Sequence, residues 1–168
     1  MTSKKNLWGE LPKPETIRTP YTILKEQASI LSEITNGLLI GEITNNHKDN
    51  FFVNIFRIKV PSINNYTYSV VEAQYPIKLY PVFVKNLTSD NFNNLEKFRN
   101  LEKNLMNAAN NPLMSVVDPG GLLVQQGYSK YSSEEEFENA LGQILSSQEV
   151  KRVISALLAQ IHADIPKQ

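Results

Sequence analysis

The sequence has no cysteine and only two histidines among its 168 residues. Without cysteine, the chain has no disulfide, no thiolate nucleophile, no cysteine-ligated zinc and no iron–sulfur cluster. His47 and His162 lie far apart in the sequence and form no H-E-x-x-H or H-x-H pattern. We therefore predict no metal site and no cofactor, and we place His47 in a polar turn and His162 near a helix end.

Net charge and long apolar runs are also missing. Seventeen lysine and arginine residues balance 17 aspartate and glutamate residues. Proteins that bind nucleic acid through its phosphates usually carry a basic excess, so this balance disfavours nonspecific nucleic-acid binding. No segment approaches the roughly 20 apolar residues of a membrane span, and no secretory apolar run follows Lys4 and Lys5. We expect a soluble, cytoplasmic protein.

The remaining composition is that of an ordinary globular protein, with 41% hydrophobic and 20% charged residues. A chain of this length typically forms one domain. Residues 1–18 contain two prolines and no hydrophobic period, so we predict an extended leader followed by a single α+β domain over 19–165. Trp8, the only tryptophan, is expected to fold back over that domain or to contact a partner.

Helical spacing of apolar residues occurs in three parts of the chain. The first part, residues 20–36, begins with Thr19 as an N-cap before a proline and ends at an Asn-Gly pair. Residues 89–109 have similar spacing but are rich in asparagine, which lowers helix propensity. The segment over 86–112 is therefore either part of the core or a helical insertion.

The C-terminal part predicts two successive helices. Ser133 with Glu136 has the spacing of a capping box, and an apolar face follows it. Ser146 with Glu149 repeats the capping spacing and opens the second helix, which has its own apolar face.

Strand-like runs rich in β-branched and aromatic residues fill the middle of the chain, at residues 38–44, 51–60, 66–73 and 77–85. Short polar turns join them, which is typical of an antiparallel meander. Pro81 cannot donate a ladder hydrogen bond, so the fourth strand is expected at an edge or with a bulge. Residues 113–126 form a fifth hairpin or a loop, with Asp118-Pro119-Gly120-Gly121 as a tight turn.

The predicted fold is therefore α+β. It has an N-terminal helix, a four- to five-stranded, mainly antiparallel meander sheet, and a C-terminal helix pair packed on the sheet. The strand at 51–60 is apolar at both its odd- and its even-numbered positions, which face opposite sides of a sheet. Val53 and Ile55 would lie on one side, and Phe56 and Ile58 on the other. Such a strand needs cover on both faces, from helices of this chain or from a second copy.

The first functional hypothesis is a non-catalytic binding protein that acts through a protein interface. No G-x-S-x-G elbow or phosphate-binding glycine loop is present. Tyrosine and tryptophan are enriched at binding hot spots, so we select Trp8, Tyr66, Tyr68 and Tyr80 as contact residues. A homodimer is the favoured assembly, because two-fold dimers are the commonest soluble oligomers.

Two alternatives stay open. One is a metal-dependent hydrolase or nuclease in which Asp49 and Glu72 hold a divalent cation and Lys78 positions water, which requires the three side chains to converge. The other is a small-molecule binding domain with an enclosed apolar pocket between sheet and helices.

Overall fold

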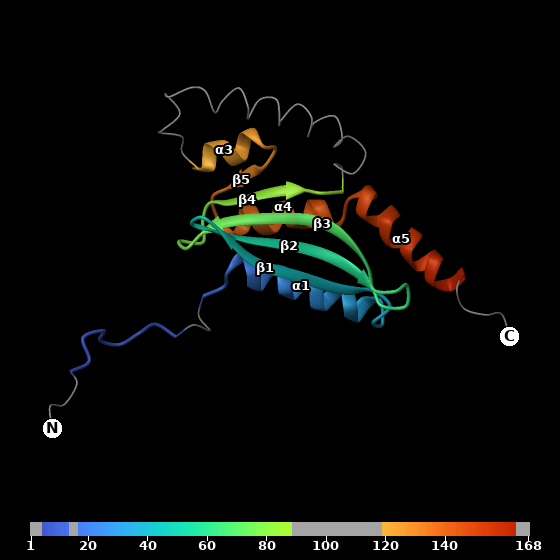
Figure 1. Cartoon of the computed structure of the whole chain (residues 1–168), viewed down its shortest axis with the longest axis horizontal. Coiled ribbons are helices and arrows are strands. Elements are labelled where there is room, and N and C mark those ends of the chain that lie inside the picture. Colours follow the sequence, from blue (N-terminus) through green and yellow to red (C-terminus); the bar gives the residue numbers. More distant parts are fainter. Residues whose placement is uncertain (1–4, 14–16, 89–118, 164–168) are drawn as a thin grey trace.

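The computed structural model of the chain describes residues 5–13, 17–88 and 119–163. Helix α1 (Pro20–Ile34) precedes four strands, β1 (Ile40–Lys48), β2 (Phe51–Val60), β3 (Tyr66–Pro76) and β4 (Val82–Asn86). Helix α3 (Pro119–Gln125), strand β5 (Ser129–Tyr131) and helices α4 (Glu134–Leu145) and α5 (Gln148–Ala163) follow. Figure 1 shows the predicted α+β arrangement, which is confirmed: an N-terminal helix, an antiparallel meander and a C-terminal helix pair packed on the sheet.

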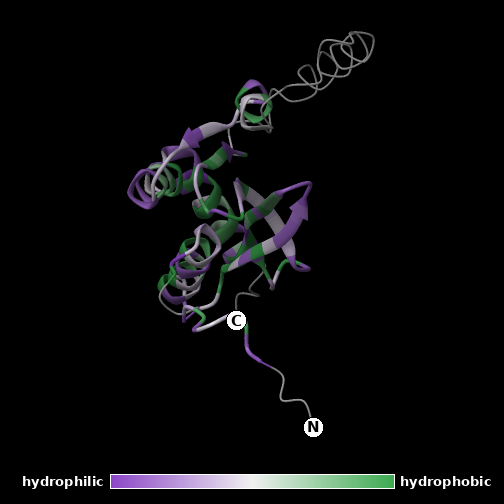
Figure 2. Ribbon diagram, turned by 90° about the vertical axis from the view of Figure 1, so that its left-hand side faces the viewer, coloured by the Kyte–Doolittle hydropathy of each residue, from purple (hydrophilic) through white to green (hydrophobic). Residues whose placement is uncertain are grey.

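The five strands lie in the order β1-β2-β3-β4-β5, and each neighbouring pair is antiparallel. A bulge interrupts the pairing of β2 with β3, because Phe56 faces Val71 while Arg57 faces Ser69. Helices α1 and α4 lie together on one side of the strands (Figure 2), which we call the helix face. The opposite side, the outer face, carries the odd-numbered residues of β2 and their partners on the other strands.

The predicted end of the first strand was wrong. Strand β1 continues through the Asn45-Asn46-His47 stretch, and only Asp49 and Asn50 form the turn. The buried Asn54 on β2 explains the difference, since its Nδ2 donates to the Thr44 carbonyl at 3.3 Å and to Asn45 Oδ1 at 3.0 Å. The polar Asn45-Asn46-His47 segment therefore forms a strand because Asn54 of the neighbouring strand β2 supplies hydrogen bonds to it.

Two other boundaries also needed correction. Pro81 precedes β4 instead of lying inside it, as its missing N–H requires, so residues 77–81 form a connection. The predicted tight turn at Pro119-Gly120-Gly121 is the first turn of α3, where a proline is well tolerated at the N-terminus. The predicted helix at 89–109, and most of the 113–126 segment, lie outside the described residues.

The helix ends follow local capping chemistry. Thr19 caps α1, its Oγ1 accepting from Thr22 N at 3.1 Å. Ser133 caps α4 by accepting from Glu136 N, while Glu136 accepts in return from Ser132 N at 2.7 Å. Helix α5 begins one residue later than predicted, because the capping oxygen belongs to Ser147.

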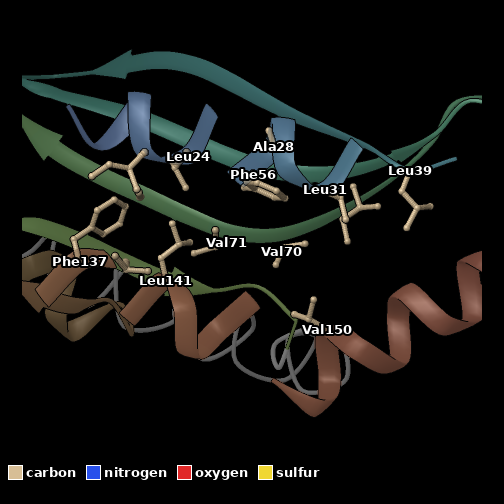
Figure 3. Close-up of a cluster of buried hydrophobic side chains, with 14 of the residues drawn as sticks. Leu24, Ala28, Leu31, Leu39, Phe56, Val70, Val71, Phe137, Leu141 and Val150 are labelled. Atoms are coloured by element: carbon tan, nitrogen blue, oxygen red, sulfur yellow. The ribbon is translucent and has the colours of Figure 1, made fainter. Parts of the chain in front are cut away.

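The hydrophobic core fills the space between the helix face and the helices. Figure 3 shows Leu24, Ala28 and Leu31 of α1, Phe137 and Leu141 of α4 and Val150 of α5 reaching toward Phe56, Val70 and Val71 of the sheet. Gly41 of β1 lies against α1 so closely that an added Cβ would be 2.3 Å from the Ala28 Cα. The absence of a side chain at position 41 therefore sets the distance between the helix and the strand.

The N-terminal arm, residues 5–13, extends away from this core (Figure 1). Trp8 is 84% exposed, and Leu7 and Leu11 are also largely exposed. The expectation that Trp8 folds back over the body of its own chain was therefore wrong for the part of the chain that the structure describes, because nothing there shields its indole. Within the described parts of the chain, no helix combines the length and apolarity needed to cross a membrane.

Candidate interaction surface

The two metal ligands of the metal-hydrolase hypothesis, Asp49 and Glu72, are not brought together, and Lys78 lies in the connection that follows β3. Glu72 faces Ile55 in the middle of β3, whereas Phe51, at the hairpin end, faces Pro76. The step from Glu72 to Pro76 is about 13 Å at about 3.3 Å per residue, and Asp49 lies beyond that end in the turn. Among the described residues, no three histidine, aspartate or glutamate side chains are grouped to hold a metal ion.

The four aromatic residues selected from the sequence lie in separate places. Tyr66 and Tyr68 face Val60 and Ile58 on the helix face of β3, where Tyr68 packs on the core and Tyr66 is 48% exposed. The Tyr80 hydroxyl is buried and has no hydrogen-bond partner among the described residues, and burial raises its pKa. With Trp8 on the arm, these side chains form no single patch.

A different surface stands out on the outer face of the sheet. Phe51, Val53 and Ile55 of β2 are each half-buried there, although they belong to the sheet's interior strands and are apolar. The buried Phe83 of β4 borders the strip, with its ring packed edge-on against Phe51 at a centroid distance of 6.0 Å. In the described chain only α3 and the residues that follow it lie on this side, beside β4 (Figure 1).

A polar network borders the apolar strip. Glu72 Oε1 accepts from the Tyr128 hydroxyl at 2.8 Å and from Gln74 Nε2 at 2.7 Å. Lys85, directly opposite Glu72 on β4, places its Nζ 5.7 Å from the centre of the Tyr128 ring. Tyr128 therefore fastens the end of α3 to the sheet through both its hydroxyl and its ring.

Local sequence explains how Tyr128 reaches this position. Gly127 adopts a left-handed conformation at φ +88, which allows the chain to turn sharply after α3. Tyr128 N then donates to the Leu123 carbonyl at 3.2 Å, the bond expected for a glycine-capped helix end. The Gly-Tyr pair after an apolar stretch was the available signal, but its partner Glu72 lies 56 residues away.

The outer face has an unequal charge distribution. Strand register places five basic side chains on it and only two acidic ones: Lys48, Arg57, Lys59, Lys85 and Lys130 against Glu42 and Glu72. Glu42 pairs with Lys59 at 3.7 Å, and Glu72 is already hydrogen-bonded. A chain with no net charge therefore presents a locally basic, partly apolar surface.

Stability should fall at alkaline pH because of Tyr128. Burial, and then the hydrogen bond to Glu72, raise its pKa above the usual 10. The folded state therefore holds the phenolic proton more tightly, so its contribution is complete below pH 10 and is lost as pH rises toward the folded pKa. Each pH unit crossed removes up to about 1.4 kcal/mol. Urea unfolding at several pH values should give a shallower decline for Tyr128→Phe, and equal slopes would contradict this.

Two hollows lie beside α1, and both open onto the surface. One, of about 310 Å³, lies between α1 and β1 next to Gly41. The other, of about 450 Å³, lies between α1 and α4, over Ile23 and Leu141. These are grooves and not the enclosed pocket between sheet and helices that the small-molecule hypothesis requires.

Comparison of the chain with protein-family models, with curated proteins and with solved structures finds no match.

Proposed function

We propose that this chain is a non-catalytic binding protein whose outer sheet face contacts another protein. The partner is a second copy of the chain or a different protein. On the outer face, the partner's contact surface carries apolar side chains flanked by acidic ones. A cytoplasmic location belongs to the same proposal and is supported by the cysteine-free composition.

The main support for this proposal is the apolar strip of Phe51, Val53 and Ile55, which basic side chains surround on the outer face. Apolar residues on a central strand are normally covered, and burying them yields about 25 cal/mol per Å² of apolar surface. The border adds charge complementarity, which steers an acidic partner and fixes its orientation. Lys59 lies beyond the Ile55 end of the strip on β2, and Lys130 lies on β5 in the same row as Val53, so a partner that contacts both lysines crosses the strip.

A photo-crosslinking residue at Asn46 tests the proposal, since Asn46 is exposed and faces Val53 on the outer face. Lysate from the native source is divided into nuclease-treated and untreated halves before irradiation. We expect the same protein to be captured in both halves. The same crosslinker at Gln160, which is exposed on α5 and does not line the α1–α4 groove, is the control and should not capture it.

Charge variants make this test specific. Lys59→Glu with Lys130→Glu should abolish capture at position 46, whereas Lys59→Arg with Lys130→Arg should retain it. Equal capture in both double variants would contradict the proposed surface. Capture that disappears after nuclease treatment would show that nucleic acid occupies the face instead.

A further inference from the structure

The N-terminal arm presents a preorganised apolar motif. Asn6 Oδ1 accepts from Trp8 N at 2.9 Å, and Asn6 Nδ2 donates to the Gly9 carbonyl at 3.3 Å. Gly9 has φ +67, which a glycine adopts without strain. This turn places the largely exposed Leu7 and Trp8 at its tip. A turn that is already formed loses less conformational entropy when it binds.

The groove between α1 and α4 has a size and an apolar floor that suit a large apolar side chain such as that of Trp8. Its floor is formed by Ile23, Leu141 and Leu145, and Gly142 on its wall adds no side chain. An added Cβ at Gly142 would meet nothing within 4 Å, so space remains there. The groove volume of about 450 Å³ lies within the range of about 300–1,000 Å³ that ligand sites occupy.

Charge is complementary as well. At the groove's end, Arg18 pairs with Glu26, Glu134 and Glu138, so three carboxylates surround one guanidinium. The hydrogen bond from Arg18 lowers the pKa of Glu26, because it favours the charged carboxylate. The arm carries two basic side chains, Lys5 before its apolar motif and Lys13 after it, against one acidic side chain, Glu10. An arm with one more basic than acidic side chain and an exposed indole thus matches a groove that has an apolar floor and an excess of carboxylates at its end.

We propose that the arm of one copy inserts Trp8 into the α1–α4 groove of a second copy, and that the reciprocal contact closes a two-fold dimer. Residues 9–17 link the motif to α1 and span up to about 30 Å when extended, which is enough to reach a neighbour. The arm already points away from its own body (Figure 1). This contact rests on the proposed function only in that the partner is a protein, because it uses neither Lys59 nor Lys130.

The only tryptophan makes the test direct. Sedimentation velocity and tryptophan emission are measured on the full chain across a dilution series. We expect a monomer–dimer equilibrium in which the emission shifts to shorter wavelength as the dimer forms. Because central aromatic anchors dominate interface energies, Trp8→Ala should weaken dimerisation by at least about tenfold while leaving far-UV circular dichroism unchanged.

The groove is tested separately at Gly142. Gly142→Gln fills the groove with a good helix former and should weaken dimerisation, whereas Gly142→Ala should largely retain it. A chain that is monomeric at all concentrations would overturn the proposal. A blue-shifted emission that is independent of concentration would mean that the arm occupies the groove of its own copy. A dimer that persists in Trp8→Ala would place the contact elsewhere. Failure here leaves the capture at Asn46 intact, so the two proposals fail independently.

Discussion

Gly41→Ala should destabilise the fold by about 3 kcal/mol, at the upper end of the range for overpacked cores. The new Cβ would meet the Ala28 Cα at 2.3 Å, its Cβ at 2.5 Å and its carbonyl oxygen at 2.8 Å. Two of these atoms are backbone, so no change of rotamer relieves the overlap. Either α1 moves away from β1, which opens the core around Leu24 and Leu31, or the edge strand shifts in register. Urea unfolding measures the loss directly.

The matched control is a second glycine in a different environment. The Gly142→Ala substitution lies in the last turn of α4, with open space around the added methyl group. It should stabilise the chain by about 0.5–1 kcal/mol through helix propensity. Opposite signs for the same chemical change would show that the effect at position 41 comes from helix–strand contact. A cost at position 41 below that of a typical surface substitution would mean that α1 does not pack as described.

The Gly41 contact also shows what the sequence could and could not predict. Helix α1 was predictable because its cap, its proline, its apolar spacing and its terminal glycine all lie within the segment itself. Strand β1 was predicted only in part, because the strand character of Asn45 depends on Asn54 of the neighbouring strand. A glycine inside a strand signalled a close approach of backbones, but the sequence did not name Ala28 as the neighbour.

The candidate surface was harder to predict for the same reason. The apolar residues Val53 and Ile55 at odd-numbered positions of β2 could be read from the sequence, and the structure places them half-buried on the outer face. The prediction that this face is covered stays a prediction. The aromatic residues chosen by composition did not assemble, because parity placed Tyr66 and Tyr68 on the helix face with the core. The hydrogen-bond network around Glu72 could not be predicted from the sequence, because strand register and the path of the chain after α3 determine which side chains meet Glu72.

Phe137→Ala should cost about 3–5 kcal/mol, the largest single loss that we expect among core truncations. The ring is fully buried and is the main side chain by which α4 enters the core (Figure 3). Truncation removes its apolar contacts and leaves a cavity between α4 and the sheet, which a short helix between two loops cannot close by moving as a unit. Phe137→Leu preserves most of the volume and should cost less than about 1.5 kcal/mol.

Amide hydrogen exchange in the Phe137→Ala variant shows whether α4 unfolds together with the sheet or separately from it. If the core between sheet and helices is cooperative, amide exchange will accelerate equally in α4 and in β2 and β3, because all of them open through global unfolding. If α4 is a separately unfolding unit, its amides alone will exchange faster while the strands remain protected. We expect the first result, because Phe137 and Leu141 belong to the same buried cluster as Phe56 and Val71. In that case the groove beside α4 has walls as stable as the sheet itself, which is what a docking site for an aromatic anchor requires.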